Sequence, residues 1–220
     1  MKRLFLLFFF ACCVMFQQAL ASDQKLVHGA GTLPHLTSAI TVSGGFEIPT
    51  LLIYAIRYDI GLGNRVQLGL SASLLGVVNA VEMHSMLNII KTESDSDFLS
   101  IYINPTISHM YNVFLPFLNV YSLGSIFLKS GVAYEHRFGA ERHIGLYLKI
   151  GSYIPIASMF DEEFRWVTSK SEYGIDGRVG FQALLGEGLS IALEPWMICF
   201  FKKDAQQMYY GGKVAFACAF

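Results

Sequence analysis

The side chains best suited to ionic or acid–base chemistry stand at alternate positions within otherwise apolar segments of this chain. Residues two apart point to the same side of an extended strand, so such side chains gather on one face of the sheet. The candidates are Arg57, Asp59, Glu82, His84, Glu135, Arg137, Lys149, Asp176, Arg178, Glu194 and Lys213. We expect these side chains to form a network of ion pairs or, alternatively, a polar path that binds a small molecule.

Nucleophilic catalysis would need a base within hydrogen-bond reach of a hydroxyl group or a water molecule. Two pairs of sequence neighbours offer these groups, His84-Ser85 and Ser108-His109. Adjacent side chains in a strand point to opposite faces, so His84 and Ser85 cannot form a dyad directly. His109 is expected to be a polar residue near a strand end. We therefore predict no catalytic residues and no enzyme activity.

Metal, cofactor and nucleic-acid sites are not indicated by the sequence. The six histidines are scattered, and neither Cys-x-x-Cys nor His-x-x-x-His spacing occurs. The 16 lysines and arginines are balanced by 17 aspartates and glutamates, whereas nucleic-acid binding rewards a concentrated basic surface. We predict no bound metal, no cofactor and no nucleic-acid partner.

The composition is unusually apolar. Charged residues make up only 15% of the chain, whereas a soluble domain carries about a quarter. A helical membrane protein would gather its apolar residues into uncharged runs of about 20. Beyond residue 21 the best such run is 113–128, and it contains Pro116 and Asn119. The apolar residues are instead dispersed by alternation, which is typical of a β-barrel that crosses a membrane.

Period-two alternation recurs in pairs of segments joined by turn residues. In residues 52–60 the even positions are apolar or aromatic, while Arg57 and Asp59 lie on the other face. Residues 65–74 repeat the pattern after a glycine-rich turn at 61–64. Similar pairs are 128–138 with 143–150, and 173–182 with 189–197. Each pair predicts a hairpin with one apolar face and one face of small or polar side chains.

These patterns predict an all-β fold: a transmembrane up-and-down antiparallel β-barrel of about ten strands within residues 36–220, with short turns at one end. The strands are expected at roughly 36–47, 51–60, 65–75, 80–90, 98–109, 119–138, 143–154, 171–184, 189–200 and 208–220. Residues 79–90 are the exception, because Asn79 and Glu82 have the spacing of a helix capping box. If that segment is helical, the barrel has eight strands.

The last expected strand carries the most specific pattern. Tyr210, Val214, Phe216, Cys218 and Phe220 share one face. This run resembles the C-terminal assembly signal of bacterial outer-membrane β-barrel proteins, in which a terminal aromatic residue follows alternating apolar residues. The resemblance implies an integral outer-membrane location in contact with outer-membrane lipid. It also implies that Tyr210, Val214, Phe216 and Phe220 are read by the barrel insertion machinery.

The first residues are expected to direct export. Lys2 and Arg3 precede an apolar stretch, and residues 19–21 form a small-x-small cleavage site, so residues 1–21 predict a cleaved signal peptide. Residues 22–35 are then a short periplasmic N-terminal segment. An even strand number places both termini in the periplasm. The expected periplasmic turns are 61–64, 91–97, 139–142 and 185–188, and the expected cell-surface loops are 110–118 and 155–170.

The barrel interior is expected to be narrow and filled mostly by side chains. Register about the turn at 185–188 puts Arg178 opposite Glu194, and the loop at 202–207 puts Glu194 opposite Lys213. Glu194 should therefore lie between two cations. Cys199 and Cys218 fall near opposite ends of adjacent strands, so we predict no disulfide between them. Aromatic residues near strand ends would form girdles where they face lipid: Phe46, Phe138, Tyr153, Tyr173, Trp196, Phe200 and Tyr209.

We therefore expect a narrow channel or carrier for small-molecule solutes. The alternative is a surface-exposed structural or adhesion protein whose loops bind a host ligand. An outer-membrane lipid-modifying enzyme is the third class, and the sequence favours it least.

Overall fold

The computed structural model describes residues 26–48, 53–75, 78–110, 122–139, 143–160, 165–168, 173–186, 188–201 and 206–220. The predicted signal peptide, residues 1–21, lies outside these ranges, and so does most of the predicted loop at 110–118. No helix in the described part of the chain is long and apolar enough to cross a membrane.

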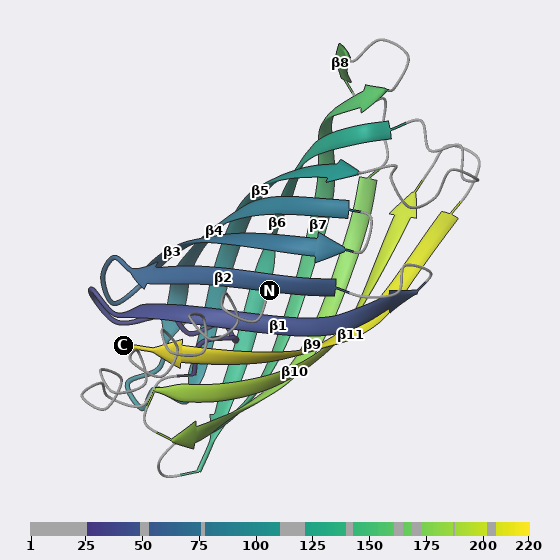
Figure 1. The fold of residues 1–220 in the computed structure, drawn as a ribbon. Helices are drawn as coiled ribbons and strands as arrows, with labels where there is room; N and C mark the ends of the chain where they lie inside the picture. Colours follow the sequence, from purple (N-terminus) through teal and green to yellow (C-terminus); the bar gives the residue numbers. More distant parts are fainter. Residues whose placement is uncertain are drawn as a thin grey trace, which may run out of the picture.

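The described chain is a closed antiparallel β-barrel (Figure 1). Its strands are β1 (Ser38–Ile48), β2 (Ile53–Gly61), β3 (Val66–Leu75), β4 (Val78–Lys91), β5 (Asp97–Met110), β6 (Ser122–Phe138), β7 (Ile144–Phe160), β8 (Arg165–Thr168), β9 (Tyr173–Gly186), β10 (Leu189–Phe201) and β11 (Gln206–Ala219). Ten of them form the ring, each pairing with its neighbour along the chain except that β7 pairs with β9 and β11 with β1. The predicted ten-strand fold is confirmed. The eight-strand alternative is wrong, because residues 78–91 form a strand.

The eleventh strand corrects one predicted boundary. Residues 155–170 were expected to be a loop, but β7 continues to Phe160 and β8 pairs with β7 alone. The extension has a simple cause, since Ile154 and Ile156 continue the outward apolar alternation of β7. In Figure 1 this β7–β8 hairpin stands out beyond the ring.

The two faces of the wall differ as the alternation predicts. Apolar side chains point outward, with exposed fractions of 53% at Leu70, 50% at Ile150 and 49% at Phe216. Polar and small side chains are buried inside, among them Asp59, Gln67 and Ala215. An apolar outer band around a polar interior is the arrangement of a barrel covered by lipid.

One end of the barrel carries tight turns at 62–65 and 92–96, together with the C-terminus, and we call it the short-turn end. Two turn glycines near this end, Gly139 and Gly188, have φ values of +83° and +71°, a backbone region that favours glycine. The ring closes here as well. Ser38 N–H donates to Phe220 O at 2.9 Å, and Phe220 N–H donates to Ser38 O at 2.8 Å.

Three of the four predicted assembly residues lie on the outer face of β11, and Phe220 follows directly after the strand. Tyr210, Val214 and Phe216 are 51%, 38% and 49% exposed, whereas the alternating residues Ala215 and Ala217 are buried inside. Cys199 pairs with Met208 and Cys218 with Leu189 in the ladder between β10 and β11. The two cysteines therefore stand far apart along adjacent strands, and no disulfide joins them.

Candidate functional site in the barrel lumen

Glu194 lies at the centre of the largest cluster of charges in the lumen. Its carboxylate is 3% exposed and lies 2.8 Å from Lys213 Nζ and 3.5 Å from Arg178 Nη1. Tyr147 donates its hydroxyl to Glu194 Oε2 at 2.9 Å. Lys149 Nζ is farther away, at 4.0 Å. A buried carboxylate needs such partners, because burial of an uncompensated charge is very unfavourable.

The predicted register of β10 is correct toward β11 and wrong toward β9. Glu194 pairs with Lys213 as expected, but Arg178 stands opposite Trp196. The ladder between β9 and β10 shifts at Leu189/Ser190. Leu189 already pairs with Gly186, so the turn is shorter than expected, and beyond the irregularity the pairing differs from the predicted one by two residues. A difference of two keeps Arg178 on the inner face. Its guanidinium reaches Glu194 diagonally.

Three ion pairs join residues two apart in one strand. Arg57 Nε lies 2.5 Å from Asp59 Oδ2 in β2, Arg137 Nε 2.6 Å from Glu135 Oε1 in β6, and Arg178 Nε 2.7 Å from Asp176 Oδ2 in β9. The carboxylates of Asp59 and Glu135 are fully buried. The spacing seen in the sequence therefore places each carboxylate beside its own cation.

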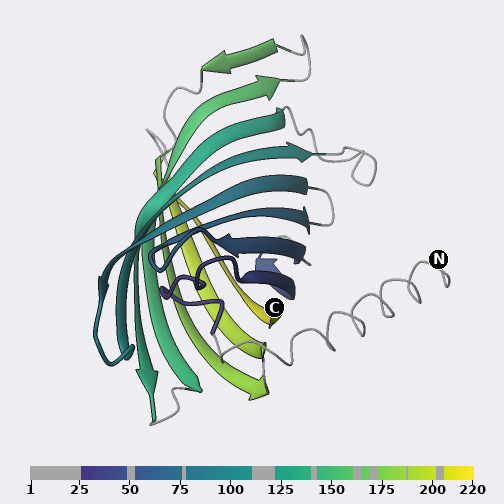
Figure 2. The same ribbon diagram turned by 90° about the vertical axis from the view of Figure 1, so that its left-hand side faces the viewer.

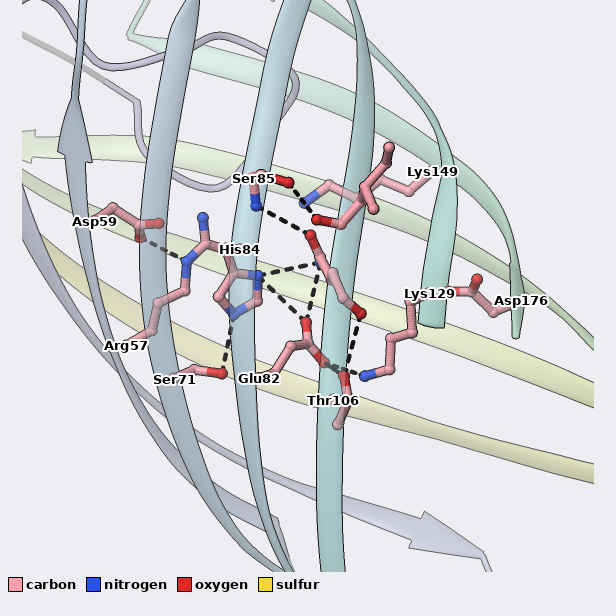
Figure 3. A network of polar contacts seen from close by, with 12 residues as sticks. Arg57, Asp59, Ser71, Glu82, His84, Ser85, Thr106, Lys129, Lys149 and Asp176 are labelled. Atoms are coloured by element: carbon pink, nitrogen blue, oxygen red, sulfur yellow. Dashed lines mark hydrogen bonds and ion pairs between the residues drawn. The ribbon is translucent and has the colours of Figure 1, made fainter. Parts of the chain in front are cut away.

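Glu82 organises a second cluster, drawn in Figure 3. Its carboxylate pairs with Lys129 and accepts hydrogen bonds from Asn104 Nδ2 at 3.1 Å and Thr106 Oγ1 at 3.2 Å. Lys129 was not among the predicted candidates. Its position in the alternation of β6, with the same parity as Glu135, was the signal that could have identified it.

His84 contacts a serine and the Glu82 cluster. His84 Nε2 lies 2.9 Å from Ser71 Oγ, and its Nδ1 lies 3.2 Å from Asn104 Nδ2 and 3.3 Å from Glu82 Oε1. Asn104 turns its amide nitrogen toward Glu82 and its oxygen toward the backbone N–H of Ser85. His84 Nδ1 therefore has a donor and an acceptor within reach, and the ring can bond to Ser71 in either tautomer.

The neighbouring serine is separated from His84, as expected for adjacent strand residues. Ser85 Oγ donates to the carbonyl of Ile103 on the outward side of the wall. His109 lies in β5 near its end, and its side chain is outside the described part. Among the described residues, no three His, Cys, Asp or Glu side chains are arranged to hold a metal ion.

A segment without regular secondary structure occupies the lumen near the short-turn end. We call residues 26–33 the inner segment; Figure 2 shows it as the dark purple trace on the concave side of the wall. Leu26, Val27, Ala30 and Leu33 are each no more than 3% exposed. Sequence analysis set these residues apart from the barrel as part of a short periplasmic segment. In the structure they lie inside it.

Polar side chains of the wall hold the inner segment by its main chain. Gln182 Oε1 accepts from His28 N–H at 3.0 Å, and Gln67 Oε1 accepts from Leu33 N–H at 2.9 Å. Glu135 Oε2 accepts from two successive amides, Ala30 N–H at 2.6 Å and Gly31 N–H at 2.7 Å.

Two wall side chains complete the set by donating to carbonyls of the inner segment. Lys149 Nζ donates to His28 O at 2.7 Å, and Ser100 Oγ donates to Ala30 O at 2.6 Å. The four wall residues Gln67, Ser100, Gln182 and Tyr147 were not among the predicted candidates. Their inward parity in the alternating strands was the available signal, but nothing in the sequence indicated what they contact.

The charges of the lumen are almost balanced. Among the described residues, the inward cations in these clusters are Arg57, Lys129, Arg137, Lys149, Arg178 and Lys213, and the carboxylates are Asp59, Glu82, Glu135, Asp176 and Glu194. Each carboxylate has a different cation as its nearest partner. Lys149 is left over, and the carbonyl of His28 is its closest acceptor.

Four aromatic residues expected in the lipid-facing girdles lie inside instead: Tyr153, Phe200, Tyr209 and Trp196, which stands opposite the inward Arg178. Tyr153 is 7% exposed, and its ring centroid lies 5.7 Å from that of Phe200, which lies 5.8 Å from that of Tyr209. Lys129 Nζ lies 5.2 Å from the Tyr153 ring centroid, a distance that permits a cation–π contact. Phe46, Phe138 and Tyr173 do face outward, with exposed fractions of 46% to 59%.

No family model and no curated protein matches the sequence. Several solved structures of bacterial outer-membrane β-barrel proteins share the general fold. KdgM porin matches with a TM-score of 0.43 and 8% identity over 83% of this chain and 99% of that chain. The translocator domain of the autotransporter NalP from Neisseria meningitidis matches with a TM-score of 0.41 and 7% identity over 84% of this chain and 87% of that one. Likeness at this level carries no argument about function.

Proposed function

We propose that this protein is an outer-membrane channel for small molecules, closed by its inner segment at the end that faces the periplasm. The observation that carries the proposal is a lumen lined by charged and polar side chains and occupied by a segment that is not part of the wall. None of the described ladder pairs of the ring includes a residue from 26–33. The ring can therefore stay closed when the inner segment leaves.

The contacts suit a segment that can be displaced. Six hydrogen bonds from wall side chains hold its main chain. A neutral hydrogen bond contributes about 0.5–1.5 kcal/mol net, and one to a charged group about 1.5–3 kcal/mol. Water or a polar solute can replace these partners in the lumen. An all-apolar contact of the same size would offer no such replacement.

The lining left behind is compatible with water. Arg57, Arg178 and Lys213 have side-chain exposed fractions of 24%, 23% and 31%, so these cations already contact open space in the lumen. The even number of ring strands supports a periplasmic location for the short-turn end, because the chain then begins and ends on the same side.

Conductance in planar bilayers tests the proposal. We expect the full-length protein to remain closed most of the time, and a variant lacking residues 26–33 to conduct steadily. Heat-modifiable gel migration and β-type circular dichroism establish that both proteins are folded. If the folded deletion variant shows neither conductance nor solute uptake in vesicles, the channel proposal is wrong.

The β7–β8 hairpin favours a second candidate, a surface protein that binds a host ligand. It extends beyond the ring (Figure 1), and β8 pairs with no strand except β7. β8 itself takes no part in the ring, although the β7 residues beside it pair with β6, so the residues of β8 are available for contacts outside. Removal of residues 157–168 should then abolish binding to host cells or matrix while conductance is unchanged. Unaltered binding would reject this candidate.

A further inference from the structure

We infer that the wall around the inner segment is a binding site for peptide main chain, and that it accepts a short peptide, bent near its centre, with glycines at two positions. The inference rests on the proposed function, in which the inner segment leaves the lumen. The chemical class of the ligand follows from the atoms that the wall contacts. All six hydrogen bonds from the wall to residues 28–33 end on backbone N–H or C=O groups.

The wall presents both kinds of partner that a peptide requires. Gln67, Glu135 and Gln182 accept four amide protons, and Ser100 and Lys149 donate to two carbonyls. The side chains of Gln67, Ser100, Glu135 and Gln182 are no more than 1% exposed. A ligand that lacks donors and acceptors at these places would leave the buried groups unpaired, and a site built to hydrogen-bond its substrate rejects such a ligand strongly.

Steric contacts fix the side chains that the site tolerates at its centre. A Cβ atom on Gly29 would lie 2.0 Å from Glu135 Oε2, and one on Gly31 would lie 2.2 Å from Arg137 Nη2. Both wall side chains are held by the ion pair between them. A peptide with glycine at these two positions therefore fits without moving Glu135 or Arg137, and a larger residue must displace one of them.

Apolar contacts determine which residues fit beside the two glycines and which residue fits between them. Val27 and Leu33 pack with Ala39, Ala217 and Ala219. Ala30 packs with Phe98 and Ala133. The favoured ligand is thus a neutral peptide with apolar residues at positions 27 and 33 and a small residue between the two glycines. An anionic sugar or carboxylate is disfavoured, because Glu135 points at the same space.

Peptide binding to the folded variant lacking residues 26–33 tests the inference. The probe is a fluorescent peptide with the sequence of residues 26–33, Leu-Val-His-Gly-Ala-Gly-Thr-Leu, measured by anisotropy in detergent. A matched peptide carries N-methyl groups on the amides of Ala30 and Gly31, which removes the two donors to Glu135. We expect it to bind about 100-fold more weakly, the effect of two charge-assisted hydrogen bonds.

A second matched peptide has alanine in place of both glycines and should also lose binding. Equal affinity for the parent and the N-methylated peptides would overturn the inference, and so would the absence of binding to a barrel shown to be folded. The outcome is separable from that of the channel proposal. A variant that conducts without binding the peptide rejects only the peptide site, and one that binds without conducting rejects only the channel.

Discussion

Substitution of Gly29 by alanine should open the lumen without disturbing the wall. The added methyl group would meet Glu135 Oε2 at 2.0 Å and Gln182 Nε2 at 2.6 Å. Glu135 cannot turn aside freely, because Arg137 Nε and Gln182 Nε2 donate to its other oxygen at 2.6 Å and 2.8 Å. Either the carboxylate or the inner segment must move.

The size of the effect follows from the bonds that are lost. Glu135 Oε2 accepts from Ala30 N–H and Gly31 N–H at 2.6 Å and 2.7 Å. Hydrogen bonds to a charged group contribute about 1.5 kcal/mol or more each, so their joint loss weakens the closed state by about 3 kcal/mol. A change of that size raises the ratio of open to closed protein about 100-fold.

Single-channel recording measures this ratio as open probability, and amide hydrogen exchange reports on the inner segment directly. Gly177→Ala is the matched control, since a Cβ atom there meets nothing within 4 Å. We expect frequent opening and fast exchange at Ala30 and Gly31 in Gly29→Ala alone. The reasoning is refuted if Gly29→Ala opens no more often than Gly177→Ala and both amides remain protected.

Three further substitutions test the wall. Glu194→Gln removes the carboxylate shared by Lys213, Arg178 and Lys149. It should lower the free energy of unfolding in urea by about 3 kcal/mol. In the variant lacking residues 26–33 it should also move the reversal potential toward anion preference. An unchanged reversal potential would contradict the placement of the Glu194 charge in the conducting lumen. Leu70→Arg places a cation on the outer face, where Leu70 is 53% exposed, and should destabilise the barrel in vesicles by about 2–4 kcal/mol if the site lies near the bilayer midplane. A loss no greater than that of Leu70→Ala would argue against lipid contact there. Phe220→Ala keeps both main-chain bonds to Ser38, so refolding of the purified protein into vesicles should be nearly unaffected while assembly in cells falls severalfold; equal assembly in cells would remove Phe220 from the signal.

The barrel itself could be predicted because its main constraint is local. Alternation with period two assigns each strand residue to a face, and the apolar face must be the outer one when lipid covers the wall. The same parity placed Arg57, Asp59, Asp176 and Arg178 on the inner face, although partners were sought on neighbouring strands and not two residues along the same strand. The capping-box spacing of Asn79 and Glu82 was outweighed by the ladder that β4 forms with both β3 and β5.

Contacts between strands were less predictable, because register depends on the details of each turn. The pairing of Glu194 with Lys213 was predicted correctly. Arg178 stands two residues from its predicted partner because Leu189 already pairs with Gly186, which makes the turn shorter than expected; the irregularity beside Leu189 changes the register by only one residue. A shift of two residues leaves each side chain on the same face of the sheet but changes the residue that stands opposite it. Tyr153 and Phe200 were considered for a lipid-facing girdle by their closeness to strand ends, a criterion that ignores which face they occupy.

The position of the inner segment could not be predicted from local patterns. Its hydrogen bonds join residues far apart in the chain, with separations of 154 residues between His28 and Gln182 and 105 between Ala30 and Glu135. The sequence around Gly29 and Gly31 has the composition of a loop and no periodicity. The residues of the wall nevertheless indicate that a segment is bound in the lumen. Glu135 and Gln182 are buried with polar groups directed into the lumen, and buried polar groups require partners. Arg137 neutralises Glu135, but its second oxygen needs donors that no other strand supplies among the described contacts. The amides of Ala30 and Gly31 supply them, so a buried inward carboxylate oxygen that no wall side chain pairs is the feature by which such a segment can be inferred from a barrel wall.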